Sequence, residues 1–351
     1  MKKILPLLLG ISFFCSSVFA APFSQIVFFG DSLTDNGNLY RAAKIIPESP
    51  PYYDGRFSNG FTWAEDLYKY YYDKYYIAVL NEGYGGTTVL PPSRSSNSQM
   101  TLRNRIHTYL SDPSVPDDKS SVLYVIWIGA NDYLWDTTSD LDTLTRSVVR
   151  ELQADMEILM NEGARHFLVL NLPDLGKTPY ARESGIIDRM HDASEKHNTV
   201  LRSTITALQN QYPADRFMMI DVESTFNDLI ANPQKYDKNI TNVTDPCLDS
   251  MLALKHSDSD KINLSNQLKK AFAADKKIQP DVDPQAMSDY VLNSPMLAQT
   301  YRLGQLHASG TASICSDADA HVFWDVIHPT EAAHRVLSSV IVKQLMSAGE
   351  G

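Results

Sequence analysis

The feature that most constrains the fold is an alternation of short, continuous apolar runs with longer segments of helical periodicity. Apolar runs occur at 25–29, 76–80, 121–128, 166–171 and 216–221. Between them, segments such as those at 140–162 and 188–210 repeat apolar residues at helical spacing. Continuous apolar runs are typical of strands buried on both faces. We therefore predict an α/β protein whose mostly parallel, five-stranded sheet is covered by helices.

The beginning of the chain has the pattern of a secretory signal peptide. Two lysines at 2–3 precede an apolar run at 4–14 and a small-residue cleavage pattern at 18–20. This run is too short to remain as a membrane anchor. We expect residues 1–20 to be removed and residues 21–351 to form a single domain, secreted to the periplasm or the medium. No later apolar run is long enough to span a bilayer, so we expect a soluble mature protein.

Charge and cysteine content narrow the partners and the compartment. The net charge of −11, without a basic stripe, argues against a nucleic-acid partner. Of the three cysteines, Cys15 lies in the signal sequence, where two bulky phenylalanines before it disfavour a lipoprotein cleavage. Cys247 and Cys315 remain, and in an oxidising compartment one disulfide is the simplest outcome, with two buried thiols as the alternative. We interpret residues 248–314 as an insertion, or lid, over the main fold.

Three short polar motifs follow successive predicted strands. FGDS occupies 29–32, NEGYGG occupies 81–86 and WIGAND occupies 127–132. Sites in open parallel sheets form beyond the carboxyl ends of the strands, where the strand order reverses. A strand order of 2-1-3 would make these three loops neighbours.

A fourth motif, FWDVIHPT at 323–330, supplies a carboxylate and an imidazole three residues apart. Together the motifs meet the needs of acyl transfer. Ser32 would be the nucleophile, His328 the base that takes its proton, and Asp325 the group that orients His328. Gly86 and Asn131 would donate hydrogen bonds to the tetrahedral oxyanion.

Each motif alone has a more ordinary interpretation. A serine after a strand usually caps a helix, and Gly-Gly or Asn-Asp pairs usually form turns. An Asp-x-x-His pair can be a surface pair or half of a metal site. The catalytic interpretation rests on finding all four, in this order, at strand ends. We expect no cofactor and no metal, because His107, His166, His191 and His321 show no ligand-like clustering in the sequence.

These four blocks resemble the GDSL, or SGNH, hydrolase family, through GDS at 30–32, the Gly86 loop, GAND at 129–132 and DVIH at 325–328. The resemblance implies a flavodoxin-like, three-layer α/β/α sandwich. It also implies that Ser32 is the nucleophile and that the oxyanion donors are its own N–H, the Gly86 N–H and the Asn131 side chain. His328 would be the base and Asp325 its partner.

A narrower resemblance is to the secreted bacterial glycerophospholipid:cholesterol acyltransferases, which also act as phospholipase A and lysophospholipase. It is carried by SPPYYDGRFSNG at 49–60, WIGANDYL at 127–134, NLPDLGKTP at 171–179, NVTDPC at 242–247 and FWDVIHPT at 323–330. It implies glycerophospholipid and lysophospholipid substrates, cholesterol as a candidate acyl acceptor and transient contact with a membrane surface. It also implies activation by a protease within 248–314, where candidate cleavage points are Lys261, Lys269, Lys270, Lys276 and Lys277.

The function expected from the sequence is therefore that of a secreted serine lipid esterase and acyltransferase working through an acyl-enzyme. Tyr52, Tyr53, Phe57 and Trp135, with the insertion, are candidates for an apolar enclosure around the lipid, and ordinary packing is the alternative for these aromatic residues. Two other functions are weighed against it. One is a short-chain or carbohydrate carboxylesterase with the same triad, and the other is a non-catalytic lipid-binding or adhesin module on the same scaffold.

Overall fold

The computed structural model describes residues 23–43, 46–91, 100–249, 265–267, 269–270, 289–291 and 294–347. The expected signal peptide at 1–20 and most of the expected insertion at 248–314 lie outside the described residues. Within the described part of the chain, no helix combines the length and the apolar character needed to cross a bilayer.

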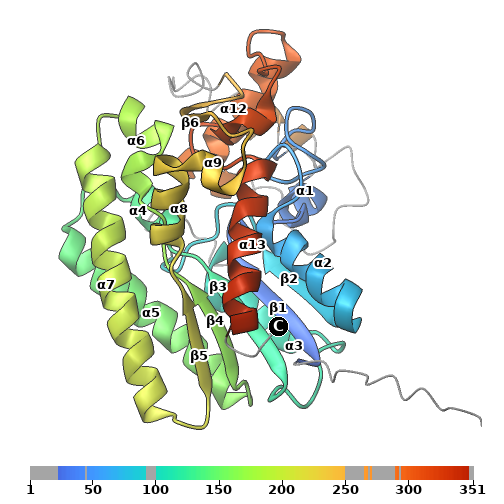
Figure 1. Cartoon of the computed structure of the whole chain (residues 1–351), viewed down its shortest axis with the longest axis vertical. Helices are drawn as coiled ribbons and strands as arrows, with labels where there is room; N and C mark the ends of the chain where they lie inside the picture. Colours follow the sequence, from blue (N-terminus) through green and yellow to red (C-terminus); the bar gives the residue numbers. More distant parts are fainter. Residues whose placement is uncertain are drawn as a thin grey trace, which may run out of the picture.

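The centre of the fold is a five-stranded parallel sheet with the strand order β2-β1-β3-β4-β5 (Figure 1). Every neighbouring pair in it is parallel. The strands are β1 (Gln25–Gly30), β2 (Ala78–Gly83), β3 (Val122–Trp127), β4 (His166–Leu170) and β5 (Arg216–Ile220). The five predicted apolar runs correspond to these strands, and the predicted order 2-1-3 is confirmed.

Helices cover both faces of the sheet, which confirms the three-layer architecture. Strand residues alternate between two cores: Val27 and Phe29 of β1 face one, and Ile26 and Phe28 face the other. The first core is covered by α3 (Leu102–Ser111), α5 (Leu141–Asn161) and α7 (Ile187–Gln211). The second is covered by α2 (Trp63–Tyr75) and α13 (Glu331–Ser347), which crosses the front of the sheet in Figure 1. Burial on both faces explains the unbroken apolar runs of β1, β3 and β4, whereas the edge strands β2 and β5 are only partly buried.

Shorter elements lie around the carboxyl ends of the strands. They are α1 (Asn38–Ala43), α4 (Ala130–Trp135), the 3-10 turn η2 (Leu175–Lys177), α6 (Pro179–Glu183), α8 (Val222–Ala231), α9 (Pro233–Tyr236), α12 (Pro295–Ala308) and the 3-10 turn η4 (Ala318–Ala320). A second, two-stranded parallel sheet pairs β6 (Asn242–Pro246) with β7 (His321–Phe323). Because β7 leads into the motif that carries Asp325 and His328, this small sheet fixes where that motif lies.

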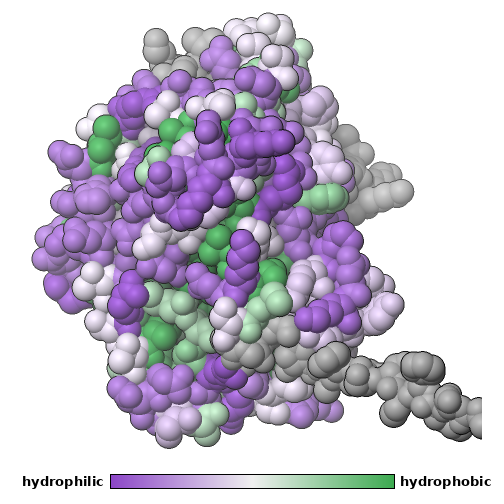
Figure 2. All heavy atoms as spheres, in the orientation of Figure 1, coloured by the Kyte–Doolittle hydropathy of each residue, from purple (hydrophilic) through white to green (hydrophobic). Residues whose placement is uncertain are grey.

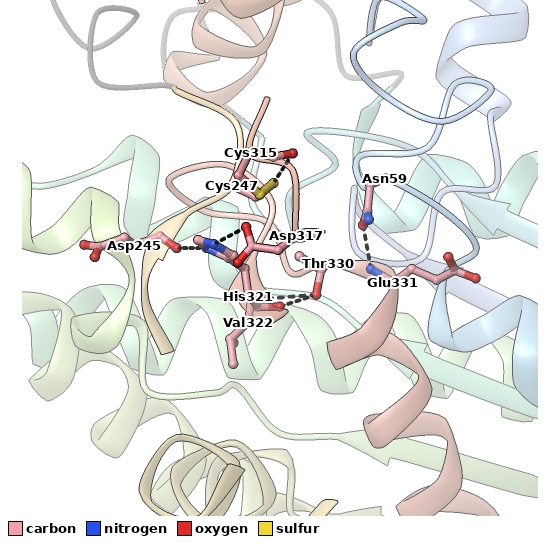
Figure 3. Close-up of a disulfide and its surroundings, with 9 residues drawn as sticks. All are labelled: Asn59, Asp245, Cys247, Cys315, Asp317, His321, Val322, Thr330 and Glu331. Atoms are coloured by element: carbon pink, nitrogen blue, oxygen red, sulfur yellow. Dashed lines mark hydrogen bonds and ion pairs between the residues drawn. A yellow bond between two sulfur atoms is a disulfide. The ribbon is translucent and has the colours of Figure 1, made fainter. Parts of the chain in front are cut away.

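A disulfide joins Cys247, just after β6, to Cys315, as predicted (Figure 3). Beside it, the Thr330 hydroxyl donates to the His321 carbonyl at 2.7 Å, and the Glu331 N–H donates to Asn59 Oδ1 at 2.8 Å. The segment between β7 and α13 is therefore held from two sides, by the small sheet and by the loop that contains Asn59.

The strand register brings the sequence motifs together. Gly30 at the end of β1 lies opposite Gly83 of β2 and Trp127 of β3. The three loops that follow therefore leave the sheet at the same edge. β2 ends at Gly83, later than expected, so the first half of the NEGYGG motif is strand and only its second half is loop.

Candidate active site

Ser32 lies in a tight turn immediately after β1. The N–H groups of Thr34 and Asp35 both donate to the Asp31 carbonyl, and the Leu33 N–H donates to the Asp31 carboxylate at 3.0 Å. A Cβ at Gly30 would lie 2.5 Å from Thr34 Oγ1 and 2.9 Å from the Trp127 carbonyl, so only glycine fits before this turn. Ser32 is 4% exposed, so its hydroxyl is held among protein atoms rather than in bulk water.

Asp325 and His328 form one local hydrogen-bonded unit. The N–H groups of Ile327 and His328 donate to Asp325 Oδ1 at 2.8 and 2.7 Å. Asp325 Oδ2 lies 2.7 Å from His328 Nδ1, and both side chains are buried. Burial opposes ionisation of Asp325, but the neighbouring imidazole and these donors hold the pKa of its carboxyl below the ordinary value. An ionised Asp325 can only accept a hydrogen bond, so Nδ1 of His328 carries the proton. This leaves Nε2 as the nitrogen that can accept a hydrogen bond.

That acceptor nitrogen points at the serine. His328 Nε2 lies 2.9 Å from Ser32 Oγ, although the two residues are 296 positions apart. The structure therefore brings the three residues predicted to be catalytic into one chain, from Asp325 through His328 to Ser32. A serine hydroxyl bonded to a neutral, oriented imidazole is the arrangement that general-base activation requires.

The two further oxyanion candidates meet at the same edge of the sheet. Gly86 has φ +81°, and a Cβ there would lie 2.4 Å from the Tyr290 hydroxyl, so its glycine identity is required. Asn131 is buried, and its Nδ2 donates to the Thr87 carbonyl at 3.0 Å. This bond ties α4 to the loop of Gly86. The oxyanion role of both residues stays a prediction.

Two buried carboxylates, which the sequence analysis missed, hold these loops in place. Asp35 accepts the N–H groups of Gly37, Asn38, Leu39 and Gly85. It therefore joins the Ser32 turn to the Gly86 loop. Burial raises the pKa of Asp35 to about 6, against the effect of its N–H donors.

Asp132 makes the corresponding link to the third loop. It accepts the N–H groups of Val89 and Leu90 at 2.9 and 2.8 Å. Burial raises the pKa of Asp132 to about 7. Asp35 and Asp132 are therefore structural carboxylates that lie close in sequence to the predicted catalytic residues Ser32 and Asn131. An aspartate a few residues after such a motif is a weak sequence signal for a carboxylate that holds a loop by accepting its backbone N–H groups.

An apolar pocket opens beside Ser32. Its empty volume is about 800 Å³, counting the part open to solvent. It runs between α8 and α13, where apolar side chains also reach the surface in Figure 2. Its lining includes Ser32, Asn131, Leu134, Leu175, Thr225, Phe226, Leu229, Met296, Ala333 and Leu337. A largely apolar pocket that reaches the serine suits the hydrocarbon part of an ester substrate.

The profile of the GDSL-like lipase/acylhydrolase family matches residues 26–341, which include the turn of Ser32 and the pair Asp325–His328. The chain belongs to this family. Similar proteins include the phosphatidylcholine-sterol acyltransferase of Aeromonas hydrophila, 29% identical over 90% of this chain and 88% of that protein. The thermolabile hemolysin of Vibrio parahaemolyticus is 24% identical over 93% of this chain and 65% of its own length. A solved GDSL-like lipase from Parabacteroides merdae matches with TM-score 0.38 and 16% identity, over 62% of this chain and 87% of that one.

In this member of the GDSL-like family, the C-terminal part of the expected insertion lies directly on the loops of Ser32 and Gly86. Ser32 Oγ is 3.4 Å from the Met296 sulfur. The Tyr290 hydroxyl donates to the Gly85 carbonyl at 2.7 Å, and Leu297 packs against Gly86. The segment that contains Tyr290 and begins α12 therefore covers both the serine and the predicted oxyanion loop.

The aromatic residues at 49–61 have separate roles. Tyr52 and Phe57 are buried against the Asp325–His328 pair, with the Phe57 ring 5.2 Å from the His328 ring. Tyr53 is 43% exposed and packs edge-on against Phe61. Of the residues proposed for a lipid enclosure, Tyr52 and Phe57 thus support the catalytic pair itself. The Trp135 side chain lies outside the described atoms.

One group of potential metal ligands occurs among the described residues, formed by Cys315, Asp317 and His321 (Figure 3). This grouping around His321 was not predicted from the sequence. His321 Nδ1 lies 2.9 Å from the Asp245 carbonyl, and Nε2 lies 3.7 Å from Asp317. The sulfur of Cys315 is bonded to Cys247, so it offers no thiolate to a metal. The group is accounted for as an imidazole and a carboxylate beside a disulfide.

Proposed function

We propose that this protein is an exported lipid esterase that cleaves the acyl ester of glycerophospholipids and lysophospholipids and can pass the acyl group to a sterol. The observation that carries the proposal is the apolar pocket that reaches Ser32, because it offers a long acyl chain a place beside the nucleophile. The similarity to an acyltransferase of phosphatidylcholine and sterol supports the choice of lipid substrates.

The reaction takes two steps. Ser32 Oγ attacks the ester carbonyl while His328 Nε2 takes its proton, and the oxyanion is held by the Ser32 N–H, the Gly86 N–H and the Asn131 amide. Collapse of the intermediate releases the lysolipid or glycerol alcohol, which receives the proton from His328. Water or a sterol hydroxyl then attacks the acyl-enzyme, and His328 moves the proton in the same way, giving a fatty acid or a sterol ester.

The pocket argues against an enzyme restricted to acetylated sugars. Its largely apolar walls offer few hydrogen-bond partners for sugar hydroxyls. The hydrogen-bonded chain from Asp325 to Ser32 likewise argues against a non-catalytic lipid-binding module. Labelling of Ser32 by a fluorophosphonate probe would exclude that module.

Regulation by a protease within 248–314 is also part of the proposal. Its support is the position of α12, which lies in the C-terminal part of the insertion and brings Met296 against Ser32. Of the five candidate lysines, Lys269 and Lys270 are exposed, and the other three lie outside the described residues. Cleavage there would free the segment before α12 from its covalent tether on one side, while the disulfide would keep the two parts joined.

The deciding experiment incubates the secreted protein with phosphatidylcholine liposomes, with and without cholesterol. Fatty acid, lysolipid and sterol ester are then measured before and after limited proteolysis. We expect fatty acid from both liposomes and sterol ester only with cholesterol. Activity on acetylated sugars with none on liposomes would contradict the proposal. Detection of the protein only inside the cell would contradict the proposed export.

A further inference from the structure

Asp325 has an additional hydrogen-bond donor that none of the four motifs supplies. The hydroxyl of Tyr52 donates to Asp325 Oδ2 at 2.7 Å. This is the same oxygen that accepts His328 Nδ1 at 2.7 Å. Tyr52 is 1% exposed, so water does not compete for the bond.

With this bond, both oxygens of the carboxylate are fully engaged. Oδ1 accepts two backbone N–H groups from its own turn, and Oδ2 accepts Tyr52 and His328. The two backbone bonds are local, so they orient the carboxylate relative to the turn only. Tyr52 is the one side-chain donor, among the hydrogen bonds described for Asp325, that comes from a distant part of the chain. It therefore fixes the carboxylate relative to the body of the protein.

Tyr52 is itself firmly placed. Its ring belongs to a small core with Leu248, Leu303 and Trp324, next to the disulfide. Its N–H donates to the Glu48 carbonyl at 3.1 Å. Burial and the charge of Asp325 raise the pKa of Tyr52 well above its ordinary value, so the phenol keeps its proton and remains a donor.

We propose that Tyr52 is a positioning residue for catalysis: its hydroxyl holds the Asp325 carboxylate in line with His328 and shares the negative charge of Oδ2. This inference rests on the proposed catalytic roles of Ser32, His328 and Asp325. It differs from an apolar packing role, because the effect depends on one O–H group. Tyr52 is absent from the lining of the pocket beside Ser32, so the effect belongs to the chemical step rather than to substrate binding.

Removal of the Tyr52 hydroxyl should shift the pH profile of activity in a defined direction. Without the phenol, Oδ2 carries more negative charge and stabilises a protonated His328 more strongly. A neutral His328 is needed to accept the Ser32 proton. The acidic limb of the pH profile of kcat/KM should therefore move to higher pH in Tyr52→Phe. Asp31 and His334 also interact electrostatically with His328, and neither residue is altered in this variant.

The test compares Tyr52→Phe with Tyr76→Phe, a matched control directly after α2 whose side chain is 79% exposed. Activity is measured on a soluble aryl ester and divided by the number of sites titrated with a fluorophosphonate, so that unfolded protein does not count. We expect kcat of Tyr52→Phe to fall between about tenfold and a hundredfold, the rate equivalent of a hydrogen bond to a charged group. KM should be unchanged, the acidic limb should shift upward, and Tyr76→Phe should match the wild type.

A double-mutant cycle separates positioning from general packing. If Tyr52 acts through Asp325, adding Tyr52→Phe to Asp325→Asn should lower kcat much less than it does in the wild type. Equal losses in both backgrounds, or a pH profile that does not move, would overturn the inference. A wild-type protein that hydrolyses no ester would instead contradict the proposed function, so the two failures are distinguishable.

Discussion

The hydroxyl oxygen of Ser32 lies 3.4 Å from the sulfur of Met296 and 2.9 Å from Nε2 of His328. A hydroxyl group has one proton, so donation to the sulfur competes with donation to the base. Met296 is the second residue of α12, a helix within the C-terminal part of the insertion. The insertion and the nucleophile are therefore in direct contact, and a displacement of α12 would change both the reach of the base and the access to the pocket.

Met296→Leu tests this competition. Leucine keeps the apolar volume, so the stability change should stay below about 1.5 kcal/mol. It removes the sulfur acceptor, and we expect faster reaction of Ser32 with a fluorophosphonate. Met346→Leu, at a position 54% exposed on α13, is the control. A slower reaction in Met296→Leu would show that the sulfur assists the site rather than competing with it.

Ser32→Ala tests the nucleophile. Loss of the hydroxyl removes the atom that forms the acyl-enzyme, so ester hydrolysis and probe labelling should both disappear. The free energy of unfolding should change by no more than about 1.5 kcal/mol, the net value of one hydrogen bond. Ser203→Ala, at an exposed position of α7, should behave as the wild type in both assays. Hydrolysis that persists in Ser32→Ala would place the nucleophile elsewhere.

Thr225→Trp tests whether the acyl chain occupies the pocket between α8 and α13. Thr225 lines this pocket and is only partly buried, so a large side chain there fills the cavity without entering the main core. We expect kcat/KM for a long-chain ester to fall about tenfold or more, while an acetyl ester is little affected. Thr225→Val keeps the size and should retain activity on both esters. An equal loss for both chain lengths would contradict the assignment.

Removal of the disulfide tests how much the covalent link between the small sheet and the segment after α12 stabilises the protein. Its cysteines are 68 positions apart, and a loop of this size predicts a loss of about 4 kcal/mol in the loop-entropy description when the bond is removed. Replacing both Cys247 and Cys315 by alanine should therefore lower the free energy of unfolding, measured by urea titration. In protein already cut within the loop, we expect a smaller effect, because the closed loop no longer exists in the unfolded chain.

From the raised pKa of Asp132, we expect the free energy of unfolding to depend on pH. Its folded-state pKa is raised from 3.8 to about 7 by burial. The unfolded chain loses this proton first as pH rises, so the contribution of Asp132 is fully present below pH 3.8 and is lost by about pH 7. Asp132→Asn should show a shallower decline in unfolding free energy over this range, with the exposed Asp319→Asn as control. An unchanged slope would mean that the Val89 and Leu90 N–H groups keep Asp132 ionised throughout.

The sequence determined the α/β fold because its signal is local. A strand buried on both faces must be apolar along its whole length, and the runs of β1, β3 and β4 show this without reference to any other part of the chain. The motifs at the strand ends could be located in the same way. Since parallel strands end at one edge, their position after the strands was enough to predict that Ser32, Gly86 and Asn131 meet there.

The local Asp325–His328 unit was equally accessible, because three residues on one turn bring the carboxylate and the imidazole together. The pairing of Cys247 with Cys315 was the simplest outcome for the two cysteines outside the expected signal peptide, and the structure contains it. In both cases few arrangements were possible, so the sequence alone was sufficient.

The tertiary structure alone decided what supports and covers the site. The bond from Tyr52 to Asp325 joins residues 273 positions apart, and the contact of Met296 with Ser32 joins residues 264 positions apart. Neither of these two contacts leaves a periodic or regularly spaced pattern in the sequence, because one hydrogen bond or one side-chain contact constrains only the two residues that make it. The loop contacts of Asp35 and Asp132 could not be predicted for the same reason. Their donors are backbone N–H groups, which almost every residue type carries, so the sequence does not mark them. Patterns of burial are repeated along a chain and can be read from it, whereas single long-range contacts exist only once the chain has folded.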